Sequence, residues 1–333
     1  GTIKTKDGGT YSGDWKKGKR DGKGSSVYNN GERFTGQFRD NARNGDGTLV
    51  FSNGNKYVGS FKNGKRTGLG SFLFAKGGNY KGQFLNGNMT GKGTFVFANG
   101  DIYAGKFKNG TFSGEGSFKF KSGNEYIGNF KENQSHGKGT YIYNNGDKYI
   151  GEWNKGKRTG EGTLIFSNGD RYVGQFMLGK SSGKGTLSFA NGNKYVGDFH
   201  NDKYHGNGKY TKPNGDKYNG EWKNGKMHGK GQFLFANKDR YEGEYKHGRM
   251  DGKGVFFFSN GDKYIGEFQN NQNHGKGTYI KSNGTKHNGD WKNAKMHGKG
   301  TTTYSNGKVE KGIWDNNKLV KILETSRTSK QKN

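Results

Sequence analysis

Residues 57–79 read YVGSFKNGKRTGLGSFLFAKGGN, and this pattern returns every 23 residues along the chain. Its anchor is Tyr-x-Gly-x-aromatic, and a Gly-x-Gly pair follows. The anchor begins at fourteen positions in unbroken register, the last two degenerate: Tyr11, Phe34, Tyr57, Tyr80, Tyr103, Tyr126, Tyr149, Tyr172, Tyr195, Tyr218, Tyr241, Tyr264, His287 and Glu310. A fixed period of this length is typical of stacked supersecondary units. Because the register leaves no room for an inserted catalytic loop, we expect no enzyme activity.

Each repeat contains two alternating segments separated by turn residues, which predicts a β-hairpin. In the first segment Tyr57, Gly59 and Phe61 share a face, since side chains alternate along a strand. In the second segment, Gly70 and Phe72 share a face in the same way. One surface therefore carries only rings and glycines, because a large ring can lie across a strand only where that strand has no Cβ. We expect residues 63–67 to form the loop of this hairpin.

The link between repeats is also a turn. Residues 52–56 separate Phe51 from Tyr57, and both rings stay on one face only if the loop holds an odd number of residues. A three-residue loop, a type I turn followed by a left-handed glycine, meets this demand. The single proline, Pro213, falls at the first position of such a loop, where a φ near −65° is favourable.

These patterns predict an all-β fold: an extended, single-layer antiparallel meander of hairpins, rod-like and gently twisted, whose aromatic face forms a shallow lengthwise groove. We assign residues 1–317 to the repeat array, 318–323 to a C-terminal capping strand and 324–333 to a basic flexible tail. Gly1 occupies the repeat phase of Gly24. We therefore expect the chain to begin inside a repeat of a longer protein.

The composition fits stacked repeats better than a conventional core. Only 27% of the residues are hydrophobic, while 64 are glycine and 14% are aromatic. Repeat arrays do not need a large aliphatic core, because each unit packs only on its neighbours. The chain has no cysteine, which suits a reducing compartment. Since no signal peptide or transmembrane run is recognisable, we predict a cytoplasmic location.

Positive charge is spread evenly along the chain. The formal net charge is +29, and 27 basic and 13 acidic residues precede position 166, with 30 and 15 after it. A charge of this distribution favours an extended acidic partner over a small ligand.

Residues 218–231 and 264–277 carry Tyr-x-Gly-x-(Trp/Phe), then His-Gly-Lys-Gly. Together with the trailing Asn-Gly-Asp of other repeats, this pattern resembles the MORN repeat (membrane occupation and recognition nexus) from residue 1 to about 317. The resemblance implies a structural role, since such repeats occur in ciliary, cytoskeletal and membrane-junction proteins. The family also includes appendages of lipid kinases and a histone methyltransferase, whose catalytic domains are absent from this sequence. The choline-binding repeat is a weaker match, because its Trp-Tyr-Tyr clusters are missing.

Two patterns imitate cofactor sites. Five histidines align at one repeat position (His136, His205, His228, His274 and His297), but neighbouring ones should lie about 10 Å apart. Zinc needs ligand atoms about 2 Å away, so we expect no metal. Residues 179–186 resemble a phosphate-binding loop, but have three residues between the glycines where the motif needs four. We therefore expect no cofactor.

Three sets of residues are candidates for binding partners. The first comprises rings that line the predicted groove: Tyr126, Tyr149, Trp153, Tyr172, Tyr195, Tyr218, Trp222 and Tyr264. The second comprises lysines on the opposite face that would meet an acidic surface: Lys23, Lys92, Lys138 and Lys184. The third would form a homodimer through an array end: Trp314, Leu319, Ile322 and Leu323.

Some lysines of the C-terminal repeats are expected to be paired with carboxylates and so less available to a ligand. The predicted pairs lie across single hairpins: Glu221–Lys230, Glu244–Lys253, Glu267–Lys276 and Asp290–Lys299.

Two hypotheses of function remain. The chain is either a scaffold of a cytoskeletal or ciliary assembly, with tubulin among its candidate partners, or a peripheral tether that binds anionic phospholipids by charge alone. Nucleic acid is a poorer candidate, because stacking on bases needs rings that packing leaves free.

Overall fold

The computed structural model describes residues 1–327 and divides into two compact units, Gly1–Ser167 and Asn168–Asn333. All regular structure in the described residues is β-strand. No helix among them has the length and apolar character needed to cross a membrane. The predicted fold class, an all-β antiparallel meander of hairpins, is confirmed.

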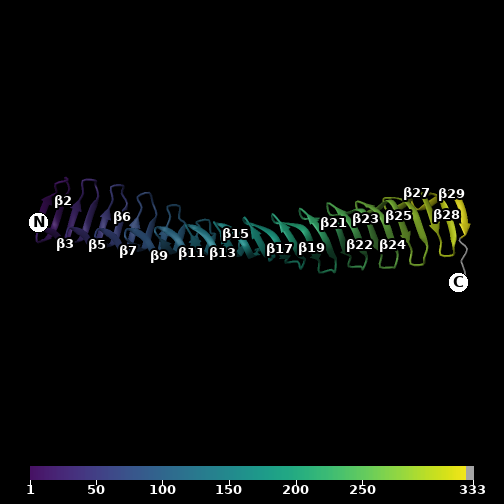
Figure 1. Cartoon of the computed structure of the whole chain (residues 1–333), viewed down its shortest axis with the longest axis horizontal. Helices are drawn as coiled ribbons and strands as arrows, with labels where there is room; N and C mark the ends of the chain where they lie inside the picture. The colour runs from purple at the N-terminus through teal and green to yellow at the C-terminus, as the bar shows by residue number, and fades with distance from the viewer. Residues whose placement is uncertain (328–333) are drawn as a thin grey trace. The chain divides into compact units, whose positions relative to one another are not determined.

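The first unit holds fifteen strands in chain order (Figure 1): β1 (Thr2–Lys4), β2 (Thr10–Lys16), β3 (Lys19–Val27), β4 (Arg33–Arg39), β5 (Ala42–Val50), β6 (Lys56–Lys62), β7 (Lys65–Leu73), β8 (Asn79–Leu85), β9 (Asn88–Val96), β10 (Ile102–Lys108), β11 (Thr111–Lys119), β12 (Glu125–Lys131), β13 (Gln134–Ile142), β14 (Lys148–Asn154) and β15 (Lys157–Ile165). The second unit holds β16 (Arg171–Met177), β17 (Lys180–Ser188), β18 (Lys194–His200), β19 (Lys203–Thr211), β20 (Lys217–Lys223), β21 (Lys226–Leu234), β22 (Arg240–Lys246), β23 (Arg249–Phe257), β24 (Lys263–Gln269), β25 (Gln272–Ile280), β26 (Lys286–Lys292), β27 (Lys295–Thr303), β28 (Lys308–Asp315) and β29 (Lys318–Arg327). Within each unit every strand pairs antiparallel with its chain neighbours.

The turn inside each hairpin is shorter than predicted. Lys62 pairs with Lys65, so Asn63 and Gly64 alone reverse the chain. Their φ values are +48° and +78°, which is the type I′ geometry that Asn-Gly favours. The interpretation of residues 63–67 as the loop is therefore wrong. It failed because β7 is longer than its alternating segment suggested.

A bulge beyond the turn accounts for that difference. Gly59 pairs with Gly70, but Ser60 pairs with Thr67, so residues 68–69 of β7 lie opposite no residue of β6. The same residues pair normally with β8. Because two residues are inserted, the side chains of β7 on either side of the bulge stay on the same face of the sheet. Bulges also increase the local twist of the strands.

The loop between repeats is as predicted. The Gly54 N–H donates to the Phe51 carbonyl at 3.0 Å, the Phe51 N–H donates to the Asn55 carbonyl at 2.8 Å, and Gly54 has a φ of +82°. These bonds enclose a three-residue loop with a left-handed glycine. Pro213 occupies the first position of the corresponding loop between Lys212 and Asp216.

The core of each repeat is the anchor ring packed on glycine. Tyr57 is fully buried, and a Cβ added to Gly70 would lie 2.5 Å from its ring. The Tyr57 hydroxyl donates to the Ser60 carbonyl at 3.1 Å, and burial raises the pKa of Tyr57 to about 12. Its ring meets Phe61 edge-on at 5.1 Å and Phe84 of the next repeat at 4.9 Å. The predicted rule that rings cover glycines is confirmed.

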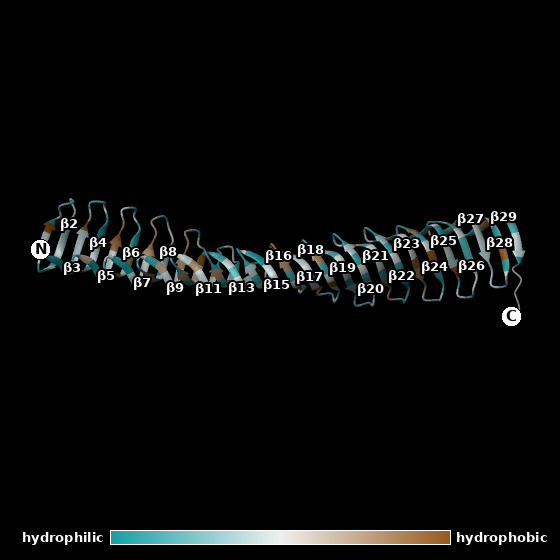
Figure 2. Ribbon diagram, viewed as in Figure 1, coloured by the Kyte–Doolittle hydropathy of each residue, from teal (hydrophilic) through white to brown (hydrophobic). Residues whose placement is uncertain are grey.

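The two faces of each unit thus differ in chemistry. We call the face that carries Tyr57, Phe61, Phe72 and their equivalents the ring face. The lysine face lies opposite and carries the central lysines of the Gly-Lys-Gly pairs. In Figure 2 the hydrophobic colour is concentrated in the strands, and the loops are mostly hydrophilic.

Loop side chains tie successive repeats together. The Asp216 carboxylate accepts the Ala236 N–H at 2.9 Å, and the Asp239 carboxylate accepts the Ser259 N–H at 2.7 Å. At the other edge the Asn41 side chain accepts the Arg20 N–H at 2.8 Å. These bonds give partners to backbone amides of the loops and, for Arg20, of the strand next to the hairpin turn.

The last strand is longer than predicted. It was placed at 318–323, but β29 continues to Arg327, which pairs with Lys308 of β28. Residues 324–327, assigned to the flexible tail, are therefore part of the sheet, because β28 offers them a backbone partner. The rest of that tail, 328–333, lies outside the described residues.

Candidate interaction surfaces

The lysine face presents a series of exposed ammonium groups, interrupted where the Gly-x-Gly pair holds another residue. They belong to the central lysines of eight Gly-Lys-Gly pairs: Lys23, Lys92, Lys138, Lys184, Lys230, Lys253, Lys276 and Lys299. The register of each lysine with the next hairpin decides whether its charge has a partner.

The predicted ion pairs within single hairpins are wrong. The Glu221 carboxylate accepts the backbone N–H of Lys230 at 3.0 Å, and that of Glu244 accepts the backbone N–H of Lys253 at 3.0 Å. The bulge brings this N–H within reach of the carboxylate, while the lysine side chain extends toward the next hairpin. The pair Glu267–Lys276 is replaced in this way, since the Lys276 ammonium meets Asp290.

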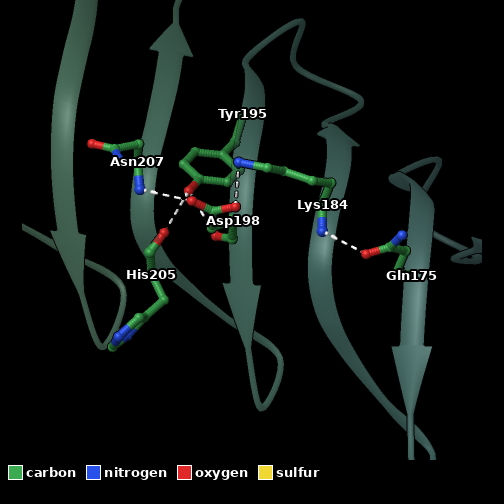
Figure 3. A network of polar contacts seen from close by, with 6 residues as sticks. All are labelled: Gln175, Lys184, Tyr195, Asp198, His205 and Asn207. Carbon is green, nitrogen blue, oxygen red and sulfur yellow. Dashed lines mark hydrogen bonds and ion pairs between the residues drawn. The ribbon is translucent and has the colours of Figure 1, made fainter.

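Figure 3 shows the arrangement around Lys184. Its ammonium lies 2.6 Å from the Asp198 carboxylate of the following hairpin. A second oxygen of Asp198 accepts the backbone N–H of Asn207 at 2.9 Å. Burial opposes ionisation of Asp198, but the hydrogen bonds from Lys184 and Asn207 and the charge of Lys184 together outweigh it and keep the pKa of Asp198 below its usual value. This lysine is exposed but already paired.

The four lysines proposed to meet an acidic surface therefore divide into two kinds. Lys138 lies opposite Glu152 in register, and Lys184 is paired with Asp198. Lys23 lies opposite Gln37, and Lys92 lies opposite Lys106. Within residues 1–327 no carboxylate makes an ion pair with Lys23, Lys92 or Lys138, but Lys138 has the carboxylate of Glu152 opposite it and the other two have none. These two ammonium groups are the ones most available to a ligand.

The rings proposed to line the groove lie in the core. All eight have exposed fractions of 8% or less, from 0% for Tyr149 to 8% for Trp222. Trp222 also donates its indole N–H to the buried Gly208 carbonyl at 3.0 Å. A partner on the ring face would touch other rings first.

Those other rings stand in the second strand of each hairpin and the loop after it. In the first unit they form a continuous row, with neighbouring centroids 4.6–6.1 Å apart. We call it the ring row: Phe51, Phe72, Phe74, Phe95, Phe97, Phe118, Phe120, Tyr141 and Tyr143. Most of them are half-buried. Both the buried anchor rings and the half-buried rings of this row are predicted from the sequence to lie on the aromatic face. The one difference in the sequence is the glycine that stands two residues after each anchor ring.

A variable position beside the hairpin turn also reaches the ring face. Its side chain covers the anchor ring: Phe112 stacks on Tyr103 with centroids 3.8 Å apart, and Tyr204 stacks on Tyr195 at the same distance. The residues at this position are Arg20, Arg43, Arg66, Met89, Phe112, Ser135, Arg158, Ser181, Tyr204, Met227, Met250, Asn273, Met296 and Leu319. Sequence reasoning missed it, although its variability between fixed neighbours was a usable signal.

The ring face of the second unit is hollowed near its C-terminal end. A concavity of about 640 Å³ is lined by Met250, Met296, Phe258, Trp291 and Trp314 among others. It lies where His287 replaces the anchor tyrosine.

The polar atoms around the His287 imidazole are only partly hydrogen-bonded. The Nδ1 atom of His287 lies 2.9 Å from the Thr302 hydroxyl, but its Nε2 atom and the indole N–H of Trp314 are buried without a partner. Burial lowers the pKa of His287 to about 4.

Residues at the C-terminal end that were proposed for dimerisation are placed differently from one another. Trp314 is buried and Leu319 is half-buried, while Ile322 and Leu323 are 59% and 55% exposed. β29 pairs with β28 along one edge, and no pairing at its other edge is found among residues 1–327. In the same described range, no three His, Cys, Asp or Glu side chains gather as metal ligands would.

A family model of the MORN repeat matches thirteen consecutive segments of 23 residues, from 11–33 to 287–309. The chain belongs to the MORN-repeat family. The resemblance seen in the sequence is thereby confirmed. The count from the sequence is fourteen repeats and that of the family model is thirteen, because the first includes the degenerate copy at Glu310. MORN repeats form interaction scaffolds, and the two faces described above are the surfaces that this array offers.

Solved structures resemble the chain only distantly. The TCP domain of Drosophila melanogaster SAS-4, in complex with a proline-rich motif of Ana2, is 14% identical over 47% of this chain and 85% of that chain, with a TM-score of 0.31. The TCP10 domain of Danio rerio CPAP, in complex with a STIL peptide, is 12% identical over 78% and 95%, with a TM-score of 0.24. A streptogramin B lyase is 10% identical over 86% and 88%, with a TM-score of 0.14. Likenesses this weak carry no functional inference. No curated protein matches the chain.

Proposed function

We propose that this MORN array is a non-catalytic scaffold of a cytoskeletal assembly, ciliary or cortical, which binds acidic protein surfaces such as that of tubulin. The observation that carries the proposal is the even distribution of positive charge. Both units have about twice as many basic as acidic residues. Charges about 10 Å apart act almost independently at physiological salt, where the screening length is about 8 Å. Binding should therefore grow with the number of repeats engaged.

The residues of the two faces support a binding role over catalysis. The anchor tyrosines are committed to the core by packing and by their hydroxyl hydrogen bonds, as in Tyr218, which donates to the Glu221 carbonyl at 2.9 Å. A nucleophile, a base and a group that orients the base are needed for covalent catalysis. The polar side chains of these repeats serve as turn and bulge caps instead.

The second candidate function is a peripheral tether for anionic phospholipids. It is favoured by Lys23 and Lys92, whose ammonium groups have no carboxylate opposite. Each basic residue near an anionic membrane contributes about 1 kcal/mol. The protein would then lie at a membrane surface as well as in the cytoplasm.

Self-association is part of the proposed scaffold. The exposed Ile322 and Leu323, and the edge of β29 that has no strand partner among residues 1–327, suit an isologous contact between two copies. Analytical ultracentrifugation should show a dimer whose population rises with concentration. A strict monomer at high micromolar concentration would exclude this contact.

The two functions are distinguished by co-sedimentation of the full chain with microtubules and, in parallel, with phosphoinositide vesicles at about 150 mM salt. Pelleting with microtubules supports the cytoskeletal scaffold. Pelleting with vesicles alone supports the tether and contradicts the scaffold. Pelleting with neither contradicts both.

A further inference from the structure

Three arginines of the first unit stand in line on the ring face. Arg20, Arg43 and Arg66 occupy the variable position of three successive repeats. Each guanidinium lies over the anchor ring of its own repeat and an anchor-strand ring of the next, 5.3–5.8 Å from the centroids. We call these three residues the arginine ladder. Because every step makes the same two contacts, the guanidinium groups repeat with the period of the hairpins.

The positive charges of the ladder are not compensated by the protein. Within residues 1–327 no carboxylate oxygen forms an ion pair with any of the three. Arg20 and Arg66 each donate one hydrogen bond to the backbone of the following turn, to Asn41 at 2.8 Å and to Gly87 at 2.6 Å. Arg20 also donates a long hydrogen bond to the Ser26 hydroxyl at 3.5 Å. The Nη1 atom of Arg43 is buried without a partner. A guanidinium has five N–H donors, so most of the donors of the ladder remain unused.

Partial burial makes this arrangement unfavourable in the free protein. All three side chains are half-buried, and burial lowers the pKa of Arg66. A charge moved out of water is costly unless it is paired. Contact with rings offsets only part of that cost. An anionic group from a ligand would supply the missing partner.

The ring row begins beside the last step of the ladder. Arg66 contacts Phe51 and Phe72 of that row, at 5.7 and 5.1 Å from their centroids. Arg43 contacts Tyr28 at 5.7 Å, which holds the repeat position of Phe51 one repeat earlier.

The ladder occupies three successive repeats of the first unit. Arg158 also lies over its anchor ring, 5.4 Å from the centroid of Tyr149, but the neighbouring repeats hold Ser135 and Ser181 at this position. In the second unit the same position holds Met227, Met250 and Met296 among others, so an anionic ligand has no such site there.

The spacing between successive arginines matches the spacing of side chains in one peptide conformation. Equivalent residues of successive hairpins are two strands apart, about 9.6 Å. A polyproline II helix rises about 3.1 Å per residue and has three residues per turn, so every third side chain points the same way at about 9.3 Å intervals. This conformation is also the one that rows of aromatic side chains commonly bind.

We propose that the arginine ladder and the ring row bind an acidic, extended peptide segment of a partner protein, with a carboxylate at every third residue. The proposal rests on the scaffold function and names one class of partner for its ring face. Carboxylates would meet the guanidinium groups of Arg20, Arg43 and Arg66. The intervening apolar or proline residues would pack on the rings beside them, Tyr28, Phe51 and Phe72.

The test uses the full chain and two labelled peptides of equal composition in fluorescence anisotropy at about 150 mM salt. One peptide is four copies of Glu-Pro-Pro. The other places its four glutamates in one block before the eight prolines. We expect saturable binding of the first, and binding at least about fivefold weaker for the second. Equal binding of both peptides, or no binding of the first, overturns the proposal.

Protein variants locate the binding to the ladder. Arg43→Gln should weaken binding of the first peptide about tenfold, as expected for loss of a charge-assisted contact. Arg39→Gln removes the same charge from an exposed position outside the ladder and should change it less than twofold. Equal losses would show general charge attraction and refute the ladder.

A folding control keeps the result decisive. If Arg43→Gln unfolds its repeats, as seen by circular dichroism, Arg43→Lys retains the charge but not the planar fork and should still weaken binding severalfold. Binding of the chain and its variants to phosphoinositide vesicles is measured separately. If the vesicles bind through Arg43 while the peptide does not, the ligand is a lipid phosphate and the peptide proposal is wrong. A chain that pellets with microtubules but ignores both peptides would retain the scaffold function and lose only the ladder.

Discussion

The packing of rings on glycine predicts a large local effect of Gly70→Ala. Gly70 has no left-handed φ, so the backbone accepts alanine and the effect comes from space alone. The new Cβ would lie 2.5 Å from both the Cε2 and the hydroxyl oxygen of Tyr57, a ring that is fully buried. Tyr57 must move, and its hydrogen bond to the Ser60 carbonyl is then lost.

The magnitude follows from these two losses. Overpacking of a core costs about 1–3 kcal/mol, and a hydrogen bond of this kind contributes about 1 kcal/mol. The stiffer unfolded chain of the alanine variant offsets about 0.4–1 kcal/mol. The central values leave a net loss of about 2.3 kcal/mol, which should speed amide hydrogen exchange in β6 and β7 about 50-fold. Hydrogen exchange is the suitable assay, because a repeat array need not unfold as one unit.

Two comparisons make the result specific to the ring. Gly64→Ala meets no atom within 4 Å and has a φ of +78°, so it carries only backbone strain and should speed exchange less than about tenfold. In a Tyr57→Leu background, Gly70→Ala should cost much less than in the wild type. Exchange at the wild-type rate in Gly70→Ala, or an equal cost in both backgrounds, would refute the reasoning.

Three further predictions follow from the same structure. Trp222→Phe removes the buried indole hydrogen bond to Gly208 and should lower the local free energy of unfolding by about 1–3 kcal/mol, measured by hydrogen exchange in β19–β21; no change would contradict it. His287→Tyr restores the anchor ring and should stabilise the last repeats. Because burial holds the pKa of His287 near 4, below about 6.5 in the unfolded chain, protons bind the unfolded state first and wild-type stability falls from about pH 6.5 to pH 4. The gain of His287→Tyr in thermal denaturation should therefore be larger at about pH 5 than at about pH 7, and an equal gain would contradict this. Burial raises the pKa of Tyr57 to about 12, so the unfolded chain loses this proton at lower pH than the folded chain does. Stability should therefore fall as pH rises from about 10 to 12. Ultraviolet titration of the folded protein should show ionisation of Tyr57 only near the upper end of that range.

The repeat period was sufficient to predict the fold class, the ring-on-glycine packing and the three-residue loop at residues 52–54. All three depend on alternation and on turn chemistry, which are local properties. The bulge at residues 68–69 is not local, since it exists only between β6 and β7 and disappears in the pairing with β8. This is why the hairpin loop was predicted too long and why the ion pairs were assigned to the wrong hairpin.

The candidate sites were harder to predict, because exposure depends on neighbouring repeats. Tyr149 and Phe120 are both predicted to lie on the aromatic face, yet Tyr149 is fully buried and Phe120 is only half-buried. Arg43 lies in a loop-like stretch of the sequence, and only the two-residue turn places it over Phe34 and Phe61. A position that varies inside an otherwise fixed repeat was the available signal.

The central claim is that unpaired charge on this array recognises an acidic protein surface. The most direct measurement is the affinity of the full chain for microtubules, by pelleting at about 50 and 200 mM salt, for two matched variants. Lys23→Gln with Lys92→Gln removes two ammonium groups that make no ion pair in the described chain, while Lys184→Gln with Lys276→Gln removes two that are paired. We predict affinity that falls with salt and a clearly greater loss in the first variant. Absence of pelleting, or equal losses in both variants, would contradict the account.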